Sequence, residues 1–168
     1  MFHILPDNCV LPFQKLRTEK RLTFANLKGP VILDIPADPP AMCIVRALVD
    51  TISARIGFEP AQADRLVLAV DEACTNVIRH AYKNKGDERI VVTFSIGAGS
   101  LVISVRDFGI GAAPETFRGR DLNDIRPGGL GTHFITSAVD RIEYDNPPGG
   151  GVLLKLTKFL PEEEKERN

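Results

Sequence analysis

Apolar residues recur every three or four positions in two long stretches of the chain, Ala41 to Ile56 and Ala61 to Tyr82. This spacing matches the turn of an α-helix, so each stretch predicts a helix with one apolar face. Gly57 follows the first stretch and is expected to end that helix. A shorter third helix is expected from Thr132 to Val139. In the second stretch, the apolar positions are Leu66, Val70, Ala73, Val77 and Ala81.

Short runs rich in β-branched residues, bounded by glycine and proline, predict the strands. We expect strands over residues 31–35, 89–96, 101–106, 141–144 and 151–158, and a weak edge strand over residues 21–27. The strands come mainly as hairpins, and the helices are partly segregated from them. The predicted fold class is therefore α+β: a two-layer α/β sandwich with a mixed, mostly antiparallel sheet and helices on one face.

The composition is that of one globular domain, with 168 residues, 43% hydrophobic and 26% charged. We expect an N-terminal extension over residues 1–30, the domain over residues 31–160 and a solvated tail over residues 161–168. The formal net charge of -1 provides no basic surface for DNA, RNA or anionic lipid, so neither nucleic acid nor a membrane is an expected partner. Three separated cysteines and the lack of a signal-like start predict a cytoplasmic protein.

Glu72 and Asn76 lie four positions apart in the second predicted helix, off its main apolar stripe, and so share one side of it. A solvated polar face is the simplest interpretation of such a pair. The functional interpretation is a carboxylate that orients or deprotonates a nucleophile, beside an amide oxygen that ligates a hard cation such as magnesium. The pair alone does not decide between the two.

Two glycine motifs follow farther along the chain. The motif DFGIG, residues 107–111, comes directly after a predicted strand. It is either a turn or a place where Asp107 accepts a hydrogen bond from a ligand amino group, while Gly109 and Gly111 allow the ligand to come close. The motif GGLG, residues 128–131, precedes the third helix. It is either a flexible link or a row of backbone N–H groups that bind phosphate.

Taken together and in this order, the three elements resemble the GHKL (Bergerat-fold) ATPase superfamily. This superfamily includes gyrase-type ATPases, sensor histidine kinases and anti-sigma-factor serine kinases. The resemblance covers about residues 31–158, and the segment DEACTNVIRHAY, residues 71–82, is most similar to the anti-sigma-factor serine/threonine kinase branch. It implies ATP and magnesium as cofactors.

The resemblance also implies a role for each motif residue. Glu72 would be the general base and Asn76 the magnesium ligand. Asp107 would bind the adenine amino group, with Gly109 and Gly111 beside the base. The residues implied to meet the phosphates are Gly129, Leu130, Gly131 and Thr132, and residues 112–127 would form the ATP lid.

The function implied by this resemblance is that of an ATP-dependent protein serine/threonine kinase resembling an anti-sigma factor. Such a kinase binds a sigma factor and phosphorylates a small antagonist protein in a partner-switching pathway, commonly as a homodimer. An ATP-gated regulatory binding module without productive phosphoryl transfer needs the same pocket and stays open as an alternative. A plain interaction domain without nucleotide would require the three-motif match to be accidental.

Overall fold

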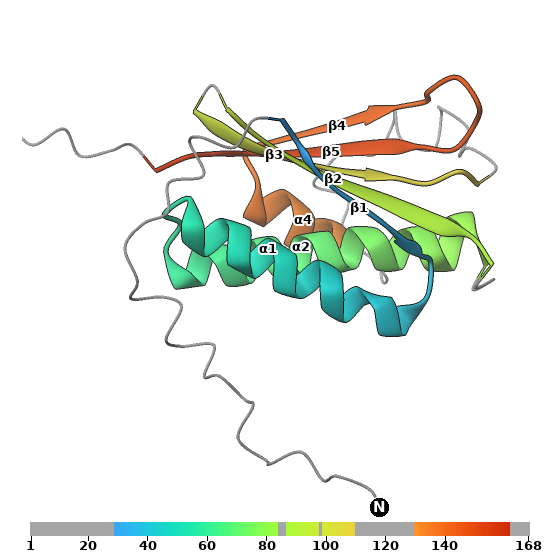
Figure 1. Ribbon diagram of the computed structural model, residues 1–168, viewed down its shortest axis with the longest axis horizontal. Coiled ribbons are helices and arrows are strands. Elements are labelled where there is room, and N and C mark those ends of the chain that lie inside the picture. The colour runs from blue at the N-terminus through green and yellow to red at the C-terminus, as the bar shows by residue number, and fades with distance from the viewer. Residues whose placement is uncertain (1–28, 84–86, 98, 110–129, 162–168) are drawn as a thin grey trace, which may run out of the picture.

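The computed structural model describes residues 29–83, 87–97, 99–109 and 130–161 (Figure 1). Within these ranges the elements are β1 (Val31–Pro36), a short 3-10 helix η3 (Pro39–Ala41), α1 (Met42–Arg55), α2 (Pro60–Asn76), a π-helix η4 (Val77–Ala81), β2 (Arg89–Gly97), β3 (Ser100–Arg106), α4 (Leu130–Ala138), β4 (Arg141–Asp145) and β5 (Leu153–Phe159). The predicted edge strand over residues 21–27 lies outside the described residues.

The five strands form one sheet in the order β1-β2-β3-β5-β4, and each neighbouring pair is antiparallel. Val92, Val105 and Leu154 lie side by side across β2, β3 and β5, and all three are buried. Alternate strand residues point to the opposite face. The α+β sandwich is therefore confirmed, and the described sheet is wholly antiparallel rather than mixed.

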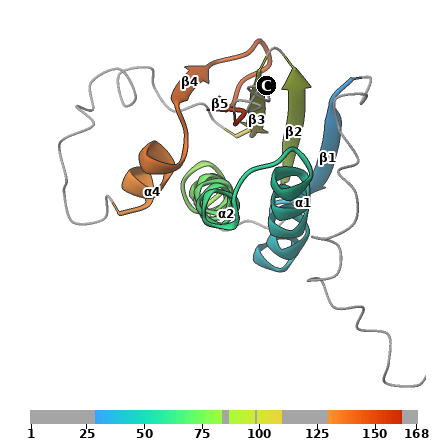
Figure 2. The ribbon, with the colours of Figure 1, turned by 90° about the vertical axis from the view of Figure 1, so that its left-hand side faces the viewer.

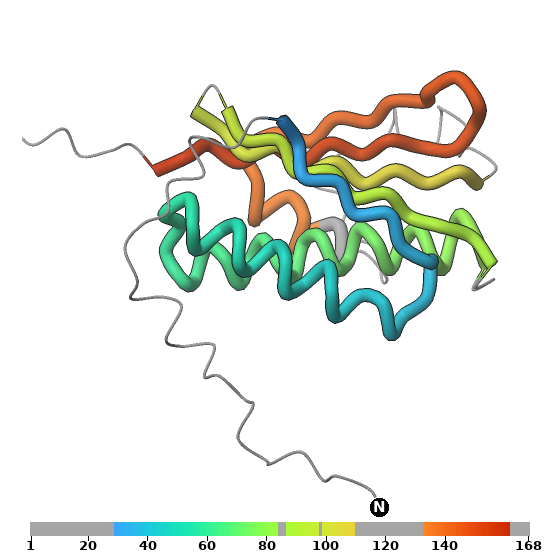
Figure 3. Tube along the Cα trace, in the orientation of Figure 1, coloured from blue at the N-terminus to red at the C-terminus, as the bar shows by residue number. Residues whose placement is uncertain are grey.

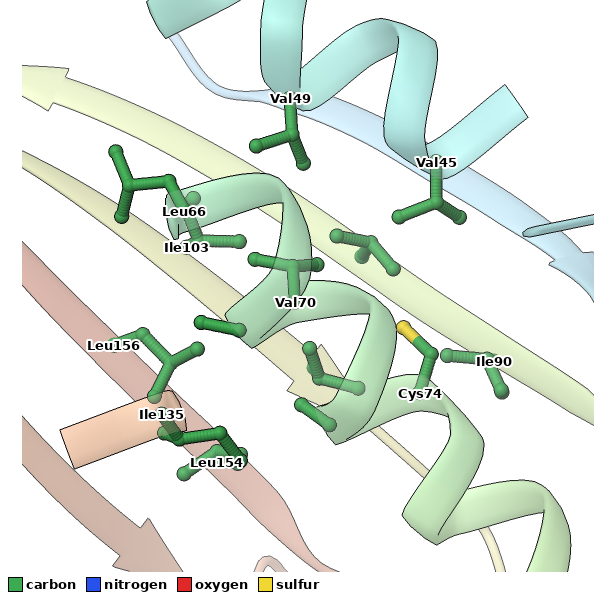
Figure 4. Close-up of a cluster of buried hydrophobic side chains, with 14 of the residues drawn as sticks. Val45, Val49, Leu66, Val70, Cys74, Ile90, Ile103, Ile135, Leu154 and Leu156 are labelled. Carbon is green, nitrogen blue, oxygen red and sulfur yellow. The ribbon is translucent and has the colours of Figure 1, made fainter. Parts of the chain in front are cut away.

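The three described α-helices, α1, α2 and α4, cover the same face of this sheet (Figure 2). Close packing of α1 against α2, and of α2 against α4, completes the helical layer. The core lies between the layers: in Figure 4, Val45 and Val49 of α1 and Val70 of α2 face strand residues such as Ile90 and Ile103. These side chains are almost fully buried and belong to the larger cluster of buried apolar residues that stabilises the fold.

Local sequence signals set the helix ends. Glu59 and Gln62 form a reciprocal capping box at the start of α2, where Pro60 occupies the first turn without losing a needed N–H group. Gly57 adopts a φ of 96° just after α1, as expected for a residue that ends a helix. Among the described helices, none is long and apolar enough to cross a membrane.

The predicted helix over residues 61–82 differs from the structure in its last part. The α-helix ends at Asn76, and Val77–Ala81 continue it as a single turn of π-helix. The apolar spacing does not reveal this change, because one extra residue in the turn leaves the sequence pattern almost unaltered.

Candidate functional site

Three separate parts of the chain meet at one end of the molecule. The end of η4, the end of β3 and the loop between β4 and β5 lie close together there, as the chain trace in Figure 3 shows. Hydrogen bonds join these parts, so the arrangement is fixed by contacts and not only by proximity. Asp107 of the second predicted motif belongs to this arrangement, and Asn76 of the first directly precedes η4 in the chain.

Glu72 and Asn76 lie in the last part of α2, and both are half-buried. Ala73 and Cys74, between them in sequence, are buried in the core and fix the rotation of the helix. Glu72 and Asn76 therefore share a partly exposed side beside the buried one, as the four-residue spacing predicts.

The chemistry of this pair fits one kind of cation site. Among the described residues, no three His, Cys, Asp or Glu side chains come together in a way that could hold a metal ion. Asn76 offers a single amide oxygen. Magnesium is commonly held by one or two protein oxygens, with water and substrate phosphates completing its coordination, so the residues present fit that ion.

A π-turn follows Asn76 and leads into Tyr82. In an α-helix, a residue five positions after Val77 lies about 140° around the axis from it. In a π-turn, the hydrogen bond spans five residues and brings the fifth residue nearly back above the first. The backbone N–H of Tyr82 donates to the carbonyl oxygen of Val77 over 3.1 Å, and Tyr82 is only 3% exposed. The aromatic ring is thus directed inwards.

Asp107 follows β3 and is 4% exposed, with both carboxylate oxygens engaged by backbone groups. Oδ1 accepts a hydrogen bond from the N–H of Gly109 over 3.0 Å, and Oδ2 accepts one from the N–H of Val152 over 3.2 Å. A carboxylate has about four lone-pair sites, so each oxygen can still accept another donor. Asp107 is therefore a buried acceptor held in one orientation.

Gly109 of the DFGIG motif lies where a larger side chain would not fit. A Cβ on Gly109 would lie 3.1 Å from the carbonyl oxygen of Ala81 and 3.3 Å from Cε1 of Tyr82. Both distances are tighter than ordinary contact. Gly109 thus allows the turn to pack directly on the end of the π-helix, and its first role here is close packing within the protein.

A glycine-rich loop between β4 and β5 supports Asp107 from the other side. Gly151 has a φ of 70°, and a Cβ there would collide with the carbonyl oxygen of Asp107. Arg106 binds this loop, since its Nη2 donates to the carbonyl oxygen of Gly150. The guanidinium of Arg106 also lies 4.8 Å from the ring centre of Phe108. The loop, the arginine and the turn therefore form one connected unit.

Sequence reasoning missed four contributors to this unit: Tyr82, Arg106, Gly151 and Val152. Three consecutive glycines, residues 149–151, were a usable signal, because all three adopt positive φ. No local pattern marks Val152, whose contribution is a backbone N–H from a loop 45 residues away.

The third predicted motif is described only in part. Leu130, Gly131 and Thr132 form the first turn of α4, which packs alongside α2. Gly111, Gly129 and the expected lid over residues 112–127 lie outside the described residues.

Comparison with known proteins shows the family to which the chain belongs. Residues 35–158 match the family described as "Histidine kinase-like ATPase domain". The serine-protein kinase RsbW of Listeria monocytogenes (serotype 4a, strain HCC23) is 31% identical over 86% of this chain and 96% of its own length. The serine-protein kinase RsbW of Bacillus subtilis (strain 168) is 28% identical over 76% of this chain and 84% of its own.

Among solved structures, the fold is similar to the RsbU and RsbW domains of Rv1364c from Mycobacterium tuberculosis. The TM-score is 0.57 with 22% sequence identity, and the match covers 79% of this chain and 33% of that one. The similarity supports the fold.

Proposed function

Because the chain belongs to the histidine kinase-like ATPase domain family, and within it to the branch of the serine-protein kinases, we propose that it acts as an ATP-dependent protein serine/threonine kinase resembling an anti-sigma factor. Its substrate is a serine or threonine on a small antagonist protein, and its regulated partner is a sigma factor. The similarity of residues 71–82 to anti-sigma-factor kinases supports this partner-switching role. We also propose that the protein forms a homodimer and is located in the cytoplasm.

The observation that carries the nucleotide assignment is the fixed carboxylate of Asp107. A buried acceptor with two backbone donors already in place is complementary to an amino group, as on adenine, because the amino group brings the missing donor. Desolvated hydrogen bonds of this kind discriminate strongly between ligands, since a wrong ligand leaves the acceptor unpaired. Gly109 and Gly111 lie beside the base in this proposal.

Glu72 acts as the general base. Its carboxylate takes the proton of the acceptor hydroxyl as the hydroxyl oxygen bonds to the γ-phosphorus of ATP, while the bond from that phosphorus to the leaving oxygen of ADP breaks. Asn76 holds magnesium, which when bound neutralises charge on the phosphates. The half-buried positions of both side chains on one side of α2 support this division of roles.

The start of α4 binds the phosphates. A helix N-terminus has free backbone N–H groups and a favourable dipole for an anion. The proposed contacts are Gly129, Leu130, Gly131 and Thr132, of which the last three lie in the first turn of α4.

The proposal is tested by two substitutions, Glu72→Gln and Asn76→Ala. Glu72→Gln keeps the shape of the side chain but removes the base, so ATP affinity stays near wild type while phosphoryl transfer falls about a hundred- to ten-thousand-fold. Asn76→Ala weakens magnesium-dependent ATP binding and transfer together. The readouts are the Kd for ATP, with and without magnesium, and transfer of labelled γ-phosphate to the antagonist protein.

Glu143→Gln is the matched control for the first substitution. Glu143 is an exposed carboxylate on β4, and its removal leaves both readouts unchanged. Normal transfer by Glu72→Gln would contradict the base assignment. ATP binding by the wild-type protein without any transfer would instead identify an ATP-gated binding module.

A further inference from the structure

We infer that Tyr82 is a positioning residue for adenine: its buried hydroxyl fixes the peptide group next to Asp107 and so sets the direction of the adenine-binding carboxylate. This inference rests on the proposed function, because it assigns to Tyr82 the support of the same site. The three predicted motifs do not assign a role to Tyr82, and it lies outside the pair formed by Glu72 and Asn76.

The hydroxyl of Tyr82 joins two segments that are far apart in sequence. It accepts a hydrogen bond from the backbone N–H of Phe108 over 2.7 Å and donates one to the backbone carbonyl oxygen of Arg89, also over 2.7 Å. The N–H of Phe108 belongs to the peptide group that directly follows Asp107. A rotation of that peptide group would change the direction of the Asp107 side chain, and the hydroxyl opposes this rotation.

The ring of Tyr82 restricts the same turn by contact. Gly109 packs so closely on the ring that a Cβ would lie 3.3 Å from Cε1. Tyr82 therefore contacts two residues of the turn that the Asp107–Gly109 hydrogen bond closes: Phe108 through its hydroxyl and Gly109 through its ring. That bond is one of the two that hold the carboxylate.

Two further observations agree with a fixed, protonated hydroxyl. The π-turn after Asn76 leads into Tyr82, whose backbone N–H closes the turn on Val77 and whose side chain is buried. Burial raises the pKa of Tyr82, although the hydrogen bond from Phe108 opposes that shift. The hydroxyl hydrogen that donates to Arg89 is therefore retained at neutral pH.

The test is Tyr82→Phe, which keeps the ring and removes only the hydroxyl. We expect the Kd for ATP to rise about tenfold, the effect of one buried hydrogen bond of about 1.4 kcal/mol, with kcat for phosphoryl transfer little changed. The ratio of the Kd for GTP to the Kd for ATP should fall by the same factor, because guanine does not donate to the Asp107 carboxylate. Tyr144→Phe, at the other tyrosine of the chain, is the matched control and leaves the Kd and the ratio at wild-type values.

Binding is measured well below the melting temperature of each variant, so that every sample is folded. A role in folding alone would lower the melting temperature of Tyr82→Phe while its Kd and its GTP/ATP ratio stayed at wild-type values, and this result would overturn the inference. Absence of ATP binding by the wild-type protein would instead contradict the proposed function. The two failures are therefore distinguishable.

A second measurement applies if Tyr82→Phe does not fold. Incorporation of 3-fluorotyrosine into the Tyr144→Phe variant leaves Tyr82 as the single labelled residue with its hydroxyl in place. Addition of adenosine, which lacks phosphates, should shift the fluorine resonance when the adenine end of the site fills. An unchanged resonance at saturating adenosine and at saturating magnesium-ATP would overturn the inference.

Discussion

Asp107 and Val152 bind each other twice. The backbone N–H of Asp107 donates to the carbonyl oxygen of Val152 over 3.0 Å, and the backbone N–H of Val152 donates to the Oδ2 atom of Asp107 over 3.2 Å. The first bond continues the ladder between β3 and β5 beyond the pair Arg106 and Leu153. In the second, the Asp107 side chain takes the place of the backbone carbonyl that would accept the reciprocal bond of an antiparallel pair. The sheet itself therefore positions the carboxylate that we assign to adenine.

Gly151→Ala should disrupt this arrangement, because the new Cβ meets the carbonyl oxygen of Asp107 in a backbone conformation that L side chains rarely adopt. We expect a loss of about 2–4 kcal/mol in the free energy of unfolding and a marked loss of ATP affinity. Urea denaturation and ATP titration measure the two effects.

Gly149→Ala is the control for this substitution. Gly149 also has a positive φ, of 97°, but no atom lies within 4 Å of the position of its Cβ. Only the conformational cost of about 1 kcal/mol should appear, with ATP affinity unchanged. Equal effects of the two substitutions would show that the contact with Asp107 does not matter.

Arg106→Ala and Arg89→Ala should differ, although both guanidinium groups lie over the ring of Phe108, at 4.8 Å and 4.3 Å. Arg106 also donates to the carbonyl oxygen of Gly150, so its removal frees the glycine loop; we expect a stability loss of about 1–2 kcal/mol and weaker ATP binding. Among the described residues, the Arg89 side chain adds to this an exposed ion pair with Asp34, worth about 0–1 kcal/mol. Thermal melts with and without ATP provide the comparison, and a larger effect at Arg89 would contradict it.

Adenine nucleotides should bind far better than guanine nucleotides. Guanine has a carbonyl oxygen where adenine has its amino group, and that oxygen would face the Asp107 carboxylate without a donor between them. A preference of about a hundredfold or more is expected for such a site. Parallel titrations of ATP and GTP measure this preference. Asp107→Asn should abolish it, because the amide NH₂ of asparagine would face a backbone N–H donor. Equal affinities in the wild-type protein would exclude Asp107 from this role.

Alkaline solution should destabilise the protein through Cys74. Burial, and to a smaller extent the nearby Asp71 carboxylate, raises the pKa of this thiol from 9.0 to about 12. Between those pH values the folded chain keeps a proton that the unfolded chain has released, so stability falls as pH rises, by up to about 1.4 kcal/mol per pH unit. Cys74→Ala should flatten the slope measured by urea denaturation from pH 9 to 11. Cys43→Ala, at an exposed thiol on α1, should keep the wild-type slope.

The fold could be predicted from the sequence wherever local pattern and tertiary packing agree. The apolar stripe of residues 66–81 predicted α2, and the β-branched runs predicted the strands that build the sheet. The π-turn could not be predicted in this way. Val77 faces the core in either kind of helix, and what distinguishes them is where Tyr82 finds its partners, on β2 and after β3.

The candidate site shows the same division. Glu72, Asn76 and Asp107 were identifiable because residue type and spacing along one element carry their chemistry. The residues that support them could not be identified in this way. Val152 contributes a backbone N–H, and Arg106 binds a loop that lies 44 residues away in sequence. Contacts of this kind depend on strand order, which local sequence does not encode.

Strand order also determines when the binding end of the molecule can form. Contacts within the β2–β3 hairpin and between α1 and α2 join segments that are close in sequence. The pairing of β3 with β5 joins segments that are far apart in sequence, so it can form only after β5 has been synthesised. A chain emerging from the ribosome can therefore assemble most of its helical layer and three strands before Val152 reaches Asp107. The capacity to bind nucleotide should therefore appear late in synthesis, once β5 has emerged and Val152 can bind Asp107.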